Sequence, residues 1–129
     1  MKTTLHHFAY NIAPHSLELI LELFESLGCK LEYKKPQARW CMVRQPATPI
    51  DIQLIETSDQ PVPIKIKKNA HIAFLSANPK TDLEEIKQWA GENKINFIQG
   101  NWSEKELWFD LPDLFINFVI EIMHTSVVE

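Results

Sequence analysis

The sequence has little cysteine and little arginine, and each scarcity excludes a class of protein. Its two cysteines, Cys29 and Cys41, show no Cys-x-x-Cys spacing, so neither a disulfide framework nor a thiolate zinc site is indicated. Lysine and arginine total 13 against 17 acidic residues, and only Arg39 and Arg44 are arginines. Because a duplex nucleic-acid binder needs a dense positive face, nucleic acid is not an expected partner.

Long apolar runs are also missing. No segment approaches the roughly 18 consecutive apolar residues of a membrane span. The first ten residues, MKTTLHHFAY, carry two histidines where a signal peptide would need an apolar core. With the unpaired cysteines, these absences predict a soluble cytoplasmic protein that has no membrane partner.

What is present is typical of a folded domain. The 129 residues are 45% hydrophobic and 23% charged, which is close to the globular average. A chain of this length buries roughly two-thirds of its unfolded surface, so it can fold without a metal or disulfide staple. We therefore expect one domain over residues 1–129, in which any bound metal has a functional role.

The order of predicted elements in the first half is β-α-β-β-β. A strand over residues 4–12 precedes Pro14, and leucine and isoleucine spacing predicts an amphipathic helix that Gly28 ends. Three strand-like runs follow: CKLEYK, ARWCMVRQ and PIDIQLIE. The first module is thus about 4–56, and residues 57–69, with two prolines and three lysines, are predicted to be a solvated linker.

The second half repeats this order. AHIAFLSA resembles the opening of the first half, Pro79 and Asp82 introduce a helix, and INFIQG, KELWFDL and LFINFVIEIM supply three strands. The second module is therefore about 70–123. The predicted fold class is α+β, with two βαβββ modules forming a curved mixed sheet around one cavity.

Strand parity isolates four polar side chains, because alternate residues of a strand point to opposite faces. In each half, one face of the first and last strands is apolar and suits packing on the helix. The opposite faces carry a histidine from each first strand and an amide or carboxylate from each last strand, namely His7, Gln53, His71 and Glu121. Each pair occupies matching places in its half, so we expect all four to line one concave space.

These four side chains form a plausible metal-ligand set. Imidazole nitrogen with amide and carboxylate oxygen suits divalent Zn, Mn, Fe, Co or Ni with open positions left for substrate. Without Gln53, the set equals the two-histidine, one-carboxylate triad of non-haem iron oxygenases. The plainer alternative is that each strand histidine is an ordinary polar residue and that Glu121 pairs with a nearby cation.

The paired β-α-β-β-β order, the openings LHHFAY and AHIAFL, and the closings IDIQLIE and INFVIEIM resemble the vicinal oxygen chelate superfamily. The resemblance covers residues 4–123. Its members include glyoxalase I, methylmalonyl-CoA epimerase, bleomycin-resistance proteins and extradiol dioxygenases. The resemblance implies that first and last strands supply the metal ligands, which are here His7, Gln53, His71 and Glu121, a set most like that of methylmalonyl-CoA epimerase and glyoxalase I.

The function that this resemblance implies is a metal-dependent isomerase, epimerase or lyase acting on a small oxygen-rich substrate, with Glu121 as the catalytic residue. It also implies a homodimer. Two alternatives stay open: a non-catalytic, ligand-sequestering protein of the bleomycin-resistance type, and an extradiol-type dioxygenase. Trp40 and Trp108, at comparable places in the two halves, either wall a ligand cavity or belong to the core.

Overall fold

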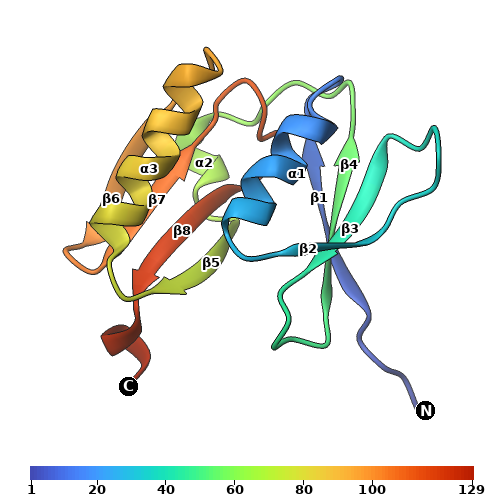
Figure 1. Ribbon diagram of the computed structural model, residues 1–129, viewed down its shortest axis with the longest axis horizontal. Helices are drawn as coiled ribbons and strands as arrows, with labels where there is room; N and C mark the ends of the chain where they lie inside the picture. The colour runs from blue at the N-terminus through green and yellow to red at the C-terminus, as the bar shows by residue number, and fades with distance from the viewer. The chain divides into compact units, whose positions relative to one another are not determined.

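The predicted α+β architecture is confirmed by a computed structural model that describes residues 1–129. The chain divides into two compact modules, Met1–Asp59 and Gln60–Glu129. No helix has the length and apolar character that a membrane crossing requires. Figure 1 shows the elements of the first module, which are β1 (His7–Ile12), α1 (Leu17–Ser26), β2 (Lys30–Tyr33), β3 (Trp40–Arg44) and β4 (Asp51–Glu56).

The second module repeats the order of the first and adds two short helices. Its elements are α2 (Ile64–Lys67), β5 (His71–Ser76), α3 (Pro79–Glu92), β6 (Ile98–Ser103), β7 (Glu106–Asp110), β8 (Val119–His124) and a 3-10 turn (Thr125–Val128). Each module holds one four-stranded mixed sheet, in the order β1-β4-β3-β2 or β5-β8-β7-β6. The first and last strands of a module pair in parallel, and the other neighbours are antiparallel.

In the first module, α1 covers one face of the sheet. Its buried residues are Leu17, Ile20, Leu23 and Phe24, at the three-and-four spacing of one helix face. They pack over alternate strand residues such as Cys41, Val43 and Leu54, which are fully buried. Gly28 follows the helix with a φ of 94°, a left-handed conformation that glycine adopts without a side-chain clash, so the chain turns directly into β2.

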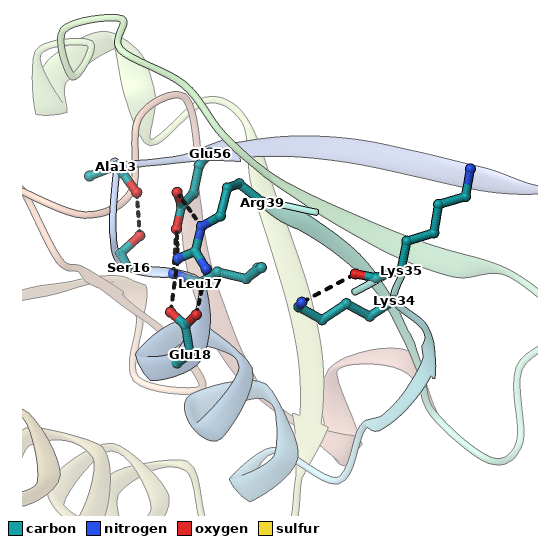
Figure 2. Close-up of polar contacts among 8 residues, drawn as sticks. All are labelled: Ala13, Ser16, Leu17, Glu18, Lys34, Lys35, Arg39 and Glu56. Carbon is teal, nitrogen blue, oxygen red and sulfur yellow. Dashed lines mark hydrogen bonds and ion pairs between the residues drawn. The ribbon is translucent and has the colours of Figure 1, made fainter. Parts of the chain in front are cut away.

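An ion-pair network joins α1 to β4 in the first module (Figure 2). Arg39 bridges Glu18 on the helix and Glu56 at the end of the strand, with its nitrogens 2.6 Å from an oxygen of each. Glu56 also accepts a hydrogen bond of 2.9 Å from the backbone N–H of Leu17, which has no partner within the helix, and so caps the helix N-terminus. The same carboxylate therefore satisfies both a guanidinium and a helix end.

Replacing Glu56 with alanine is expected to lower the free energy of unfolding by about 1–2 kcal/mol, because the helix loses its cap. Burial acts to raise the pKa of Glu56, but hydrogen bonds from Arg39 and from backbone N–H groups outweigh it and hold the pKa below 4.5. A lowered pKa gives stability that is present above pH 4.5 and is lost as the pH falls below it.

Urea unfolding at several pH values measures this loss. Glu18→Ala removes the other, more exposed partner of Arg39 and is the matched control, for which we expect a loss below about 1 kcal/mol. Equal losses in the two variants would contradict the capping role of Glu56.

The second module corrects one expectation about the lysines of the predicted linker. Residues 64–67 form α2, and Lys67 is buried rather than solvated, with an exposed fraction of 2%. Its ammonium lies 2.9 Å from Asp110 Oδ1 on β7 and donates to the carbonyl of Phe115 at 2.8 Å. A buried lysine needs such a partner because an isolated charge is costly to remove from water, so α2 is anchored to the sheet by this pair.

Candidate metal centre

The parallel pair of β5 and β8 brings His71 and Glu121 together in the second module. Ala73 lies opposite Glu121 in the register, and His71 precedes Ala73 by two residues, so the two polar side chains share one face of the sheet. The other face of β8 carries Ile120 and Ile122, which are buried. The predicted meeting of these two site residues is therefore observed: His71 Nε2 lies 3.4 Å from Glu121 Oε1.

The orientation of the His71 ring follows from its other nitrogen. His71 Nδ1 lies 3.2 Å from the backbone carbonyl of Lys68. A carbonyl can only accept a hydrogen bond, so Nδ1 is the donor, and Nε2 is the ring nitrogen that faces Glu121. When Nε2 carries no proton, its lone pair and the facing carboxylate oxygen both favour a positive centre between them.

The Glu121 carboxylate is buried and only partly satisfied. The side chain is 6% exposed, and its second oxygen, Oε2, has no hydrogen-bond partner. Burial raises the pKa of Glu121, the nearby His71 lowers it and Glu106 raises it, with a net rise above 4.5. Since unpaired buried carboxylates cost several kcal/mol, this oxygen marks a place where a proton or a cation stabilises the fold.

Two tryptophans lie on the same face as Glu121. Trp108 of β7 is the register neighbour of Glu121 and is 8% exposed, while Trp102 of β6 is 41% exposed. Gly100 lies opposite Trp108, and a Cβ atom there would come within 2.6 Å of indole Cε2. Glycine is therefore required at this point of β6 for the indole to lie against the neighbouring strand.

In the first module, the register is the same but the ligand pair is not formed. Ala9 lies opposite Gln53 and follows His7 by two residues, so His7 and Gln53 match His71 and Glu121 position for position. His7 is exposed, and its Nδ1 lies 2.9 Å from His6 Nδ1. No hydrogen bond joins His7 to the half-buried Gln53.

Sequence reasoning missed a charged pair on this face of the first module. Asp51, the register neighbour of His7, is buried and lies 2.6 Å from Arg44 Nε. The pair borders an open hollow that is lined by His6, Glu32, Tyr33, Lys35, Trp40, Met42, Arg44 and Asp51. Trp40 thus lines a hollow while Trp108 is buried, although the two occupy comparable strands. The sequence signal for this pair was the alternation in PIDIQLIE, which places Asp51 on the same strand face as Gln53.

Comparison with known proteins rests on solved structures, because no family model and no curated protein sequence matches this chain. A member of the glyoxalase/bleomycin resistance protein/dioxygenase superfamily from Sphaerobacter thermophilus superposes with a TM-score of 0.59 at 14% identity, over 96% of this chain and 98% of that chain. The antibiotic-binding protein TnmS3 from a Streptomyces species gives 0.57 at 12% identity, over 95% and 96%. The fosfomycin resistance protein FosX from Mesorhizobium loti gives 0.56 at 14% identity, over 96% and 92%.

The Sphaerobacter protein and FosX are members of the vicinal oxygen chelate superfamily. The chain has the vicinal oxygen chelate fold. The superpositions thereby confirm, for the fold, the resemblance predicted from the strand openings and closings. Identities of 12–14% do not establish an activity.

The vicinal oxygen chelate fold implies a divalent metal, and the second-module pair fits one. Two donors that each lie about 2.1 Å from one tetrahedral ion are about 3.4 Å apart, which matches the separation of His71 Nε2 and Glu121 Oε1. The Nδ1 contact with a backbone carbonyl is the usual support of a metal-binding histidine. Neither module by itself gathers three or more His, Cys, Asp or Glu side chains at metal-binding distance. His71 and Glu121 therefore provide two donor atoms with a spacing that fits such an ion.

Proposed function

We propose that this protein is a metal-dependent enzyme of the glyoxalase type, an isomerase, epimerase or lyase that acts on a small oxygen-rich substrate. The observation that carries the proposal is the pair of facing donors, His71 Nε2 and Glu121 Oε1, beside a buried carboxylate oxygen that has no partner. His71 and Glu121 are proposed as metal ligands, and His7 and Gln53, which hold the same register positions in the first module, as the others.

A bound divalent cation would act as a Lewis acid that stabilises negative charge on two neighbouring substrate oxygens. The protein supplies the rest. The backbone carbonyl of Lys68 fixes the His71 ring, and the apolar surroundings of Glu121 exclude water from one side of the carboxylate. Substrate oxygens are thereby held in one orientation beside a group that can move a proton.

Glu121 is proposed as that group. Oε1 faces His71, while the buried Oε2 has no hydrogen-bond partner and is proposed to accept a proton from the substrate carbon next to the substrate oxygens. Burial raises the pKa of Glu121, which gives the carboxylate a higher proton affinity than an exposed glutamate has. The same residue would return the proton to complete an isomerisation.

We further propose a homodimer. Each sheet ends in edge strands, and pairing between two copies covers such edges. Mixing His7→Ala protein with Glu121→Gln protein tests where the ligand pairs combine. Metal binding regained on mixing would place them in different chains, whereas a mixture that stays devoid of metal would place them in one chain. Sedimentation gives the oligomeric state independently.

A second candidate is a sequestering protein without catalysis. It is favoured by the hollow of the first module, where Tyr33 and Trp40 lie with ring centroids 5.7 Å apart, an arrangement suited to holding a planar ligand. TnmS3, an antibiotic-binding protein, shares the fold. This candidate requires no proton transfer.

Metal uptake followed by solvent exchange separates the two candidates. Protein purified without chelator is analysed for metal, loaded with Zn, Mn, Co, Ni or Fe, and incubated in deuterated water with methylmalonyl-CoA, a hemithioacetal and several 2-oxo acids. The enzyme is expected to exchange a substrate proton for deuterium only when metal is bound. Protein that binds none of these metals, or that binds ligands without exchanging a substrate proton for deuterium, would contradict the enzymatic function.

A further inference from the structure

Trp102 is the more exposed of the two tryptophans at the candidate site, and the proposed chemistry does not use it. It lies on β6 with 41% of its surface exposed, on the sheet face that carries Glu121. Its ring centroid is 4.9 Å from that of His71, at an interplanar angle of 42°, and 6.2 Å from that of Trp108. An exposed tryptophan at this distance from a metal-binding imidazole offers a flat apolar surface beside the reacting atoms.

The position of the Trp102 indole is set by its neighbours in the sheet. Gly100 allows the Trp108 indole to lie against β6, and Trp108 in turn supports Trp102. The two indoles therefore form one aromatic surface, of which Trp102 is the solvent-exposed part. Aromatic side chains of this kind bind flat ligands with little loss of conformational freedom, because only two torsion angles are fixed.

The positive charge of Lys68 near this aromatic surface restricts the charge of the ligand. Lys68 Nζ lies 6.0 Å from the Trp108 ring centroid, at the distance of a cation–π contact. The protein's own Lys68 ammonium thus occupies the place over the indole pair where a cationic ligand would otherwise bind. A cationic ligand would be repelled by this ammonium and by the proposed metal ion, so the aromatic surface suits a neutral or anionic ligand.

We propose that Trp102 stacks against a planar, unsaturated part of the substrate, and that the substrate class is aryl or conjugated 2-oxo and 2-hydroxy acids. This inference rests on the proposed function, since the oxygen pair of such a substrate would lie at His71 and Glu121. The His71 and Trp102 rings are 4.9 Å apart, so a substrate ring that stacks on the exposed part of Trp102 lies beside His71, with its adjacent carboxyl and keto oxygens within reach of Nε2.

The test compares two probes that share one head group. Phenylglyoxylate carries a planar ring and cyclohexylglyoxylate a saturated ring of similar size, so their affinity ratio isolates stacking from simple apolar burial. Both are titrated by calorimetry and by tryptophan fluorescence, with Zn²⁺ and without added metal. We expect the phenyl compound to bind about tenfold more tightly to the wild type, and the ratio to fall to about one in Trp102→Leu.

Two further variants fix the interpretation. Trp102→Phe keeps a flat ring and is expected to retain most of the phenyl preference, whereas Trp89→Phe on α3 changes a tryptophan elsewhere in the module and is expected to retain all of it. Metal affinity is expected to be unchanged in Trp102→Leu. Loss of metal in that variant would assign Trp102 to orienting His71 and overturn the stacking role.

The inference and the proposed function fail in different ways. Equal affinities of the two probes for the wild type, or no binding of either at millimolar concentration, would overturn the stacking inference. Absence of metal uptake contradicts the enzymatic function, yet a phenyl preference that disappears in Trp102→Leu without added metal would still support stacking.

Discussion

Replacing Lys67 with methionine is expected to lower the free energy of unfolding of the second module by about 3–5 kcal/mol. The change leaves the Asp110 carboxylate, which is fully buried, without the ammonium that lies 2.9 Å from it. Asp110 Oδ2 has no hydrogen-bond partner, so without Lys67 the backbone N–H of Leu111 is left to compensate part of the charge. Urea unfolding followed by circular dichroism measures the loss.

The effect of the Lys67→Met change should depend on pH in a definite direction. Burial raises the pKa of Asp110, while Lys67 lowers it, and the balance lies above 3.8. Without Lys67 the pKa of Asp110 rises further. A carboxyl whose pKa is raised in the folded state destabilises the fold as the pH rises through that pKa. The variant is therefore expected to be weakest at neutral pH and to regain stability as the pH falls toward 3.8.

The control for Lys67→Met is the double variant Lys67→Met with Asp110→Leu. It removes both charges and is expected to recover part of the lost stability, because apolar groups of similar volume replace a buried ion pair at little cost. A double variant as unstable as Lys67→Met, or a loss that does not change with pH, would show that packing and not charge explains the effect.

Replacing His71 with alanine or Glu121 with glutamine is expected to weaken divalent metal binding at least about 100-fold. Loss of an outer-shell partner alone typically lowers metal affinity by 10- to 100-fold, so loss of a direct ligand exceeds this. Gln53→Ala is expected to cost less, because an amide oxygen is a poorer donor than a carboxylate or an imidazole. Calorimetry with Zn²⁺ and the absorption of bound Co²⁺ measure the affinities without an activity assay.

His124→Ala is the matched control for the ligand variants, since it removes a histidine whose Nδ1 contacts Ser126 Oγ at 2.7 Å, outside the proposed ligand set. It is expected to bind metal as the wild type does, and all variants should keep the wild-type circular dichroism spectrum. If His71→Ala and Glu121→Gln retain wild-type affinity, then the buried carboxylate has another role and the metal proposal is wrong.

The architecture was predictable because each element carries its own periodic signal. Alternation in PIDIQLIE and INFVIEIM fixed both the strands and their faces, and the repeated order then gave the two modules. Parity also predicted that His71 and Glu121 share a face. Their 3.4 Å separation and the Lys68 carbonyl contact depend on ring orientation, which a sequence pattern does not encode.

Other features had no local signal. Lys67 lies in a polar, proline-containing stretch, and its partner Asp110 is distant in sequence, so nothing near Lys67 indicated burial. Trp102 belongs to β6, whose sequence IQGNWS shows no apolar alternation and whose residues are mostly exposed. The ring contact between Trp102 and His71 arises from strand pairing across β6, β7 and β8, which only the three-dimensional register reveals.

The parallel pairing of β1 with β4 and of β5 with β8 has a consequence for how the site forms in time. In each sheet it is the pairing with the greatest separation along the chain, and it is also the one that brings the candidate ligands to one face. Contacts of high sequence separation require the largest loop to close, so we expect them to form late in folding. The ligand positions should therefore appear only after the antiparallel strands have assembled, and slow hydrogen exchange at β8 would report directly on an intact site.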